Sequence, residues 1–175
     1  MNTRILCASV LLTLVCMAGC STVVERDGKP VGSRDTMIMV NPAGNAVNDL
    51  DYLVEICYEQ VIDPKNSSSF ILGAGKDTED NNDTSAIYVL ASGRYYPVEG
   101  APEGLFFNLD IGAGHYTYRN TDNTDVTFMY GMSLGYKIML GGFIVDIGAG
   151  ALKTDFEEDD QDFTTILRVQ AGMKF

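Results

Sequence analysis

The chain has 175 residues, a length that predicts one domain with room for a core or barrel of ordinary size. It carries 24 acidic and 12 basic residues, a net charge of −12, which argues against a nucleic-acid partner because nucleic acid is bound by basic surface. Since 46% of the residues are hydrophobic, disorder is not expected, and one histidine without a Cys-x-x-Cys pair leaves little material for a zinc site.

The first residues have the pattern of an export signal. Arg4 supplies positive charge, and residues 5–17 form an apolar stretch that is too short to span a bilayer as a mature helix. Residues 1–19 are therefore predicted to be a helical signal peptide. The stretch ends in Met17-Ala18-Gly19-Cys20, which resembles the lipobox of bacterial lipoproteins and implies lipidation of Cys20. The alternative is an ordinary signal peptide that is cut near Gly19 or Cys20.

Residues 20–35 are polar and rich in turn-forming residues, and we interpret them as the lipidated N-terminus followed by a flexible tether. The remaining part of the chain, residues 36–175, then forms a single domain. It holds only Cys57, so no intramolecular disulfide is expected.

From residue 36 onward, apolar residues alternate with other residues at a period of two, and clusters of Asn, Asp, Gly, Pro and Ser separate the segments. This pattern predicts eight strands, at residues 36–40, 52–62, 69–75, 85–96, 105–118, 126–139, 142–153 and 164–175. In the last four strands one face is apolar or aromatic at nearly every position, and the other carries glycines and charged residues.

The crowded apolar face indicates which medium surrounds the strands. The interior of an eight-stranded barrel is only just wide enough for side chains to fill it. Large residues at nearly every position would not fit inside, whereas glycine would. We therefore predict an all-β, eight-stranded antiparallel up-and-down transmembrane barrel whose bulky face meets lipid.

The opposite face is then predicted to form the lumen. It carries four acidic and four basic residues: Glu55, Glu59, Asp110, Asp146, Arg94, Lys137, Arg168 and Lys174. Because buried unpaired charge is costly, this balance predicts a network of paired charges that plugs the lumen.

The connections between strands differ in charge. Alternate connections, at 41–51, 75–84, 119–125 and 153–162, hold 14 acidic residues, whereas those at 63–68, 97–104 and 139–142 hold three. Long polar loops on one side and short turns on the other are typical of outer-membrane barrels. We expect the acidic loops to face the outside of the cell, and 139–142 to be a tight periplasmic hairpin.

Residues 36–175 resemble the small eight-stranded outer-membrane barrels, the OmpA-transmembrane, OmpX and OmpW-like group. The most specific feature is a C-terminal strand that alternates in character and ends in Phe175. In that group such a strand is the signal read by the barrel-assembly machinery. The resemblance implies a location in the bacterial outer membrane, in contact with lipid and lipopolysaccharide; it does not identify an extracellular partner.

No catalytic arrangement is visible in the sequence. The only candidate base is His115, which alternation places on the lipid face beside Tyr116, and no serine accompanies it in a triad-like motif. We therefore expect a non-enzymatic barrel without a cofactor, in a structural or interaction role. The alternative is a soluble, lipid-anchored, lipocalin-like barrel that binds an apolar ligand, in which Leu109, Leu134 and Ile147 would line the cavity.

Overall fold

The computed structural model describes residues 25–26, 29–30, 35–42, 52–77, 84–98, 101–118, 123–155 and 163–175. The predicted signal peptide at 1–19, the predicted lipidation site Cys20 and most of the acidic connections lie outside these residues. The chain divides into two units, Met1–Ser33 and Arg34–Phe175. In the first unit, strand β1 (Glu25–Arg26) pairs with β2 (Lys29–Pro30). The described residues include no helix of the length and hydropathy that a membrane span requires.

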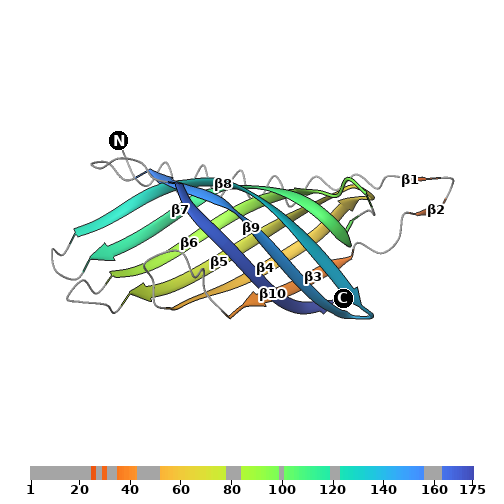
Figure 1. Ribbon diagram of the computed structural model, residues 1–175, viewed down its shortest axis with the longest axis horizontal. Coiled ribbons are helices and arrows are strands. Elements are labelled where there is room, and N and C mark those ends of the chain that lie inside the picture. The colour runs from red at the N-terminus through yellow and green to blue at the C-terminus, as the bar shows by residue number, and fades with distance from the viewer. Residues whose placement is uncertain are drawn as a thin grey trace. The chain divides into compact units, whose positions relative to one another are not determined.

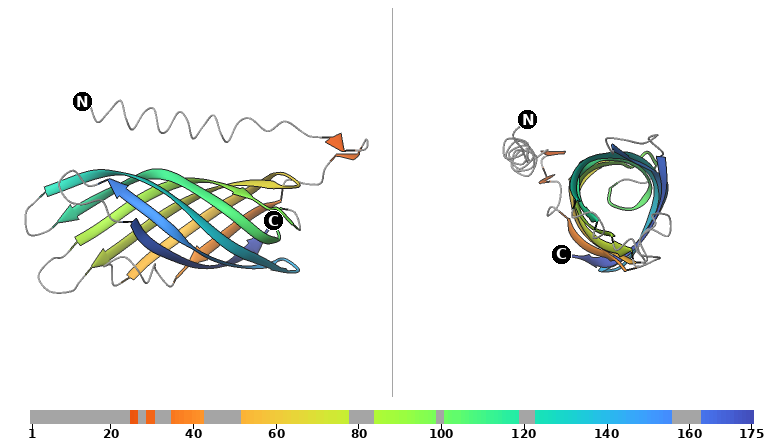
Figure 2. Two further views of the ribbon diagram at one scale, coloured as in Figure 1. Left: turned by 45° about the horizontal axis from the view of Figure 1, so that its top comes forward. Right: turned by 90° about the vertical axis from the view of Figure 1, so that its left-hand side faces the viewer.

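The second unit is a closed barrel in which every strand pairs antiparallel with its neighbours in sequence, and the last strand pairs with the first (Figures 1 and 2). Its strands are β3 (Thr36–Asn41), β4 (Tyr52–Asp63), β5 (Asn66–Asp77), β6 (Thr84–Tyr95), β7 (Gly104–Tyr118), β8 (Asn123–Leu140), β9 (Phe143–Asp155) and β10 (Phe163–Lys174). The predicted eight-stranded antiparallel up-and-down barrel is confirmed.

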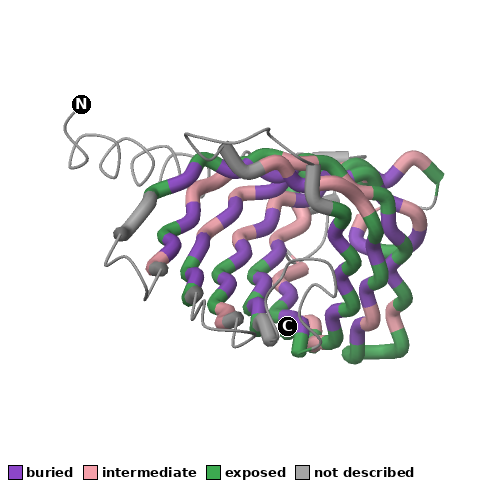
Figure 3. The backbone as a smooth tube through the Cα atoms, turned by 60° about the vertical axis from the view of Figure 1, so that its left-hand side comes forward, coloured by how far each residue is buried: buried purple, intermediate pink, exposed green. Residues whose placement is uncertain are grey.

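Burial alternates along the strands, as Figure 3 shows by its change of colour from one residue to the next. In β10, Ile166, Arg168 and Gln170 are buried in the lumen, whereas Leu167 and Val169 are exposed on the outside. Successive side chains of a strand point to opposite faces, so the direction of one side chain determines the direction of all the others in that strand. The buried and exposed faces agree with the predicted parity in the described strands except at Tyr116, which was predicted on the outer face and is buried.

Three leucine and isoleucine side chains separate the two sequence interpretations. Leu109, Leu134 and Ile147 are 66%, 48% and 47% exposed on the outer face of the barrel. A lipocalin-like barrel would need them to line an internal cavity. The soluble ligand-binding alternative is therefore not supported by the position of these side chains.

Glycines allow large rings to lie inside this narrow barrel. A Cβ atom on Gly73 would lie 2.2 Å from the Tyr88 ring, and one on Gly135 would lie 2.3 Å from the Phe106 ring. Both distances are far shorter than van der Waals contact. Any larger residue at these two positions would push the ring out of place, so glycine is required by the close packing of the lumen.

The connection between β4 and β5 is shorter than predicted. The turn consists of Pro64 and Lys65 alone, and β5 begins at Asn66, whereas the sequence predicted a turn over 63–68. The run of three serines there shows no contrast between its faces, so alternation could not detect the strand. Ser67 and Ser69 face the lumen, and the Ser67 hydroxyl donates to Glu59 Oε1 (2.7 Å). The tight hairpin predicted at 139–142 is confirmed, with Gly141 at φ +67° in the turn between β8 and β9.

Candidate functional site

Seven of the eight charged residues predicted to face the lumen are buried there, each no more than 4% exposed. They come from six strands, β4 and β6 to β10, so no single hairpin could assemble them. They are Glu55, Glu59, Arg94, Asp110, Lys137, Asp146 and Arg168. Their ion pairs divide them into two groups, which we call the Glu59 cluster and the Asp110 cluster.

The Glu59 cluster consists of Glu59, Arg94, Lys137 and Asp146. Glu59 Oε2 accepts hydrogen bonds from Arg94 Nη1 (2.7 Å) and Lys137 Nζ (2.5 Å). Asp146 Oδ2 lies 2.5 Å from Arg94 Nη1 and 3.6 Å from Lys137 Nζ. Two carboxylates and two cations thus share one buried site, and the cluster is electrically neutral. Neutrality of this kind is what a buried ionic group requires, because its desolvation is offset only by close partners.

Neutral groups complete the surroundings of the Glu59 cluster. Ser67 Oγ and the Tyr96 hydroxyl both donate to Glu59 Oε1, at 2.7 and 3.0 Å. The guanidinium of Arg94 lies over the Phe106 ring, 4.6 Å from its centroid. The aromatic rings cover the apolar parts of the cluster while the hydroxyls satisfy the second carboxylate oxygen.

The Asp110 cluster consists of Glu55, Asp110 and Arg168. Arg168 Nη1 donates to Asp110 Oδ2 (2.9 Å), and Arg168 Nε lies 3.5 Å from Glu55 Oε1. The remaining acceptor positions are filled by neutral donors. They are Asn41 Nδ2 on Glu55 Oε2 (2.9 Å), the Tyr88 hydroxyl on Glu55 Oε1 (2.5 Å) and the Ser92 hydroxyl on Asp110 Oδ1. With two carboxylates and one guanidinium, this cluster has a formal charge of −1.

Lys174 lies apart from both clusters. Its Nζ is 2.5 Å from Asp35 Oδ2, and the two side chains are 31% and 24% exposed. Lys174 is the last residue of β10, so it reaches the rim of the barrel and not its interior. Among the described residues, the structure thus places four acidic and three basic side chains in the buried lumen, and the equal balance expected from the sequence does not hold there.

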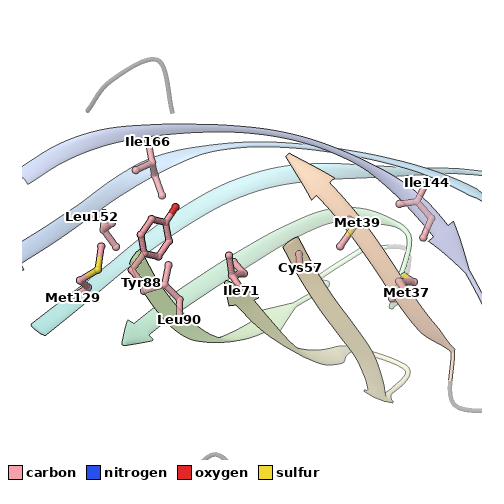
Figure 4. Close-up of a cluster of buried hydrophobic side chains, with 10 residues drawn as sticks. All are labelled: Met37, Met39, Cys57, Ile71, Tyr88, Leu90, Met129, Ile144, Leu152 and Ile166. Atoms are coloured by element: carbon pink, nitrogen blue, oxygen red, sulfur yellow. The ribbon is translucent and has the colours of Figure 1, made fainter. Parts of the chain in front are cut away.

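Buried apolar side chains line the lumen together with the charged clusters. In Figure 4, Tyr88, Leu90, Met129, Leu152 and Ile166 gather toward one end of the barrel, and Met37, Met39 and Ile144 lie toward the other. All eight are at most 4% exposed. Met37 pairs in register with Glu59, so apolar side chains pack directly against the ion pairs, where the lower local dielectric strengthens each Coulomb interaction.

Sequence reasoning missed several neutral partners of the carboxylates, namely Asn41, Ser67, Ser92 and Tyr96. Ser92 and Tyr96 lie in the predicted strand 85–96 with the parity of Arg94, so alternation could have placed these two inside, whereas Asn41 and Ser67 lie in segments that were predicted to be connections. The sequence prediction assigned only charged residues to the network. A buried carboxylate also needs neutral donors for its remaining lone pairs, and inward Ser, Asn and Tyr are the natural source.

His115 is exposed on the outer face, as predicted, but Tyr116 is not beside it there. Tyr116 is buried inside the barrel, and a Cβ atom added to Gly114 would lie 2.8 Å from its ring. Adjacent residues of a strand point to opposite faces, so the two side chains are on opposite sides of the wall. The structure places no other described titratable group with His115 that would make it a general base.

The predicted assembly signal, Phe175, follows directly after β10. Its backbone N–H donates to Thr36 O (2.8 Å), and its carbonyl accepts from Thr36 N (3.5 Å), so it lies beside the start of β3 where the barrel closes. Its side chain is 70% exposed. The ring therefore contributes little to the packing of the barrel and is accessible to another molecule.

No protein-family profile and no curated protein matches this sequence. Among solved structures, Ail, the attachment invasion locus protein of Yersinia pestis, is similar with a TM-score of 0.57 and 15% identity, covering 82% of this chain and 100% of Ail. Neisserial surface protein A (NspA) is similar with a TM-score of 0.53 and 10% identity, covering 80% of this chain and 93% of NspA. In fold, this chain is like the small eight-stranded barrels of the bacterial outer membrane.

Proposed function

We propose that the protein is a non-enzymatic barrel of the bacterial outer membrane, with a plugged lumen and acidic loops on the outside of the cell, in a structural or interaction role. The observation that carries the proposal is the inversion of polarity between the two faces. Ionic clusters lie inside the barrel, whereas large apolar side chains such as Leu109, Ile87 and Met132 are more than 60% exposed around its outside. Water would not tolerate so large an apolar surface on a monomer, but lipid would.

The proposal is tested by extraction of membranes with carbonate. The decisive variant carries Cys20→Ala and has residues 1–19 replaced by the cleavable signal peptide of a protein that is not lipidated, because it then lacks both the predicted lipid anchor and the apolar stretch 5–17 and leaves the barrel as the sole attachment. We expect it to remain in the membrane fraction as the unaltered protein does. Release of the variant into the soluble fraction would show that lipid on Cys20 or the apolar stretch 5–17, and not the wall of the barrel, holds the protein to the membrane.

We further propose that the lumen does not conduct ions. The Glu59 and Asp110 clusters and the apolar side chains packed with them occupy the narrow interior of an eight-stranded barrel and leave no continuous channel through it. Purified protein in planar bilayers should therefore give no stable single-channel steps of the size that porins give. Regular steps of that size would contradict the plugged lumen.

Phe175 is proposed to act in assembly and not in stability. Phe175→Ala should lower the amount of heat-modifiable barrel in cells several-fold, while protein refolded in detergent unfolds as the unaltered protein does. Phe143→Ala is the matched control, because Phe143 is also an outward-facing phenylalanine, 51% exposed, beside the end of β10. Equal losses in cells and in detergent would give Phe175 a structural role instead.

The partners proposed for the protein follow from this location. Outer-membrane lipid and lipopolysaccharide would surround the apolar wall, and the barrel-assembly machinery would recognise the strand that ends in Phe175. The acidic loops would extend on the side opposite the short turns at Pro64–Lys65 and Gly141–Gly142. A specific interaction would be carried by these loops, because the barrel itself does not need so many acidic residues to fold.

A further inference from the structure

A layer of polar side chains separates the two ion clusters in the lumen. Ser69, Asn108 and Gln170 form it, and all three are buried, at 6%, 1% and 0% exposed. Ser69 pairs in register with Glu59 on one side and with Ser92 on the other. Since the Ser92 hydroxyl donates to the Asp110 cluster, Ser69 lies between a residue of one cluster and a residue bound to the other.

Asn108 and Gln170 are placed in the same way from the other strands. Asn108 pairs with Arg94, and Gln170 pairs with Asp146, so each neighbours a residue of the Glu59 cluster. Each also lies two residues along its own strand from a residue of the Asp110 cluster, on the same face. Three separate strands therefore bring a polar side chain to one level of the lumen, which we call the mid-lumen layer.

Polar atoms in and beside this layer make no hydrogen bond within the described protein. They are Ser69 Oγ, Asn108 Nδ2, Gln170 Nε2 and Oε1, and Arg168 Nε and Nη2. Buried polar groups in folded proteins are almost always satisfied by protein atoms or by ordered water. The unpartnered atoms come from the residues between the clusters and from the guanidinium that borders them, so one local cause should account for all of them.

The wall beside the layer is less tightly packed than the wall at Tyr88. Gly148 pairs with Arg168 and with Gly135, and the atom nearest to a Cβ placed on Gly148 would be 3.5 Å away. A methyl group would fit there in ordinary contact. By comparison, a Cβ on Gly73 would collide with the Tyr88 ring at 2.2 Å. The barrel is therefore packed less tightly at Gly148, beside the mid-lumen layer, than it is at Gly73.

We propose that the mid-lumen layer binds a small group of ordered water molecules, which join the Glu59 and Asp110 clusters into one hydrogen-bonded network. The unpartnered atoms include N–H donors and oxygen acceptors, and water can pair with both kinds. An inorganic anion could use only the donors. It would also add negative charge next to the Asp110 cluster, which already carries a formal charge of −1.

The direct test is a high-resolution crystal structure of the full chain grown with bromide. We expect density for water within hydrogen-bond distance of the Gln170 and Asn108 side chains, and no anomalous bromide peak. A dry layer, in which Gln170 and Asn108 bond to protein atoms instead, would overturn the proposal. A bromide peak at the layer would also overturn it, since the site would then be one for anions.

A variant tests the energetic role of the bound water. Gln170→Met keeps the length of the side chain but removes both polar atoms. If water bridges through Gln170, the urea midpoint of the refolded protein should fall by about 0.5 M. If Gln170 is only an unsatisfied buried amide, the same change should raise the midpoint. Gln60→Met is the matched control, because Gln60 lies on the outer face, where the change should not lower the midpoint.

Discussion

Glu59→Gln is expected to destabilise the barrel by about 3–5 kcal/mol, as removal of one partner from a buried ionic network typically does. Glu59 accepts from Arg94 and Lys137 through one oxygen and from two hydroxyls through the other. The amide keeps the shape but loses the charge, and it leaves two buried cations with Asp146 as their sole carboxylate in the cluster. Urea titration of the protein refolded in detergent would measure the loss.

The matched control for this variant is Glu103→Gln. Glu103 is exposed, and its side chain accepts only a long hydrogen bond, 3.4 Å from Met139 N, so the same chemical change should alter stability by about 0.5 kcal/mol or less. The free energy of unfolding of both variants is measured by urea titration in the same detergent. Equal losses from Glu59→Gln and Glu103→Gln would show that the Glu59 cluster contributes nothing specific.

A second substitution tests whether the charges act together. In Glu59→Gln with Lys137→Met, the cluster retains Arg94 and Asp146, which are 2.5 Å apart and neutralise each other. The double variant should therefore be more stable than Glu59→Gln alone. Additive losses would contradict an electrostatic network, because independent sites add and coupled sites do not.

Alternation along the strands was enough to predict the barrel and the direction in which most of its side chains point. The prediction worked for β7 to β10, where large apolar residues alternate with glycine and charge, and it failed at the start of β5, where three serines have no contrast. Parity is a local property, because the alternation within one strand identifies its two faces without reference to the neighbouring strands. The fold was therefore accessible from the sequence.

The pairing of the charges was not accessible in the same way. Lys137 and Glu59 are 78 residues apart in sequence and meet across the lumen. Which inward residues reach the same level depends on the stagger of all eight strands, and sequence parity does not report that stagger. The stagger of the strands also explains the position of Lys174. This residue has the parity of the lumen, but it lies too close to the end of β10 to reach either cluster.

Leu109→Arg is the change on the outer wall for which we expect the largest effect. Leu109 is 66% exposed and lies well inside the 15-residue strand β7, between Gly93 of β6 and Met132 of β8. In a bilayer an arginine near the midplane of a barrel wall costs about 2–4 kcal/mol, because no water reaches the charge. The variant should refold into lipid vesicles in lower yield and unfold at lower urea concentration than the unaltered protein.

Val98→Arg provides the comparison that assigns this cost to lipid. Val98 is 70% exposed, slightly more than Leu109, but it lies in the connection after β6 and outside the strands of the wall. At that position an arginine remains hydrated, so stability and refolding should stay close to those of the unaltered protein. A soluble barrel would respond differently, because an exposed arginine is harmless in water at either position. If Leu109→Arg and Val98→Arg refold and unfold alike, the outer face of the barrel does not face lipid. Its exposed apolar side chains would then need another partner to cover them.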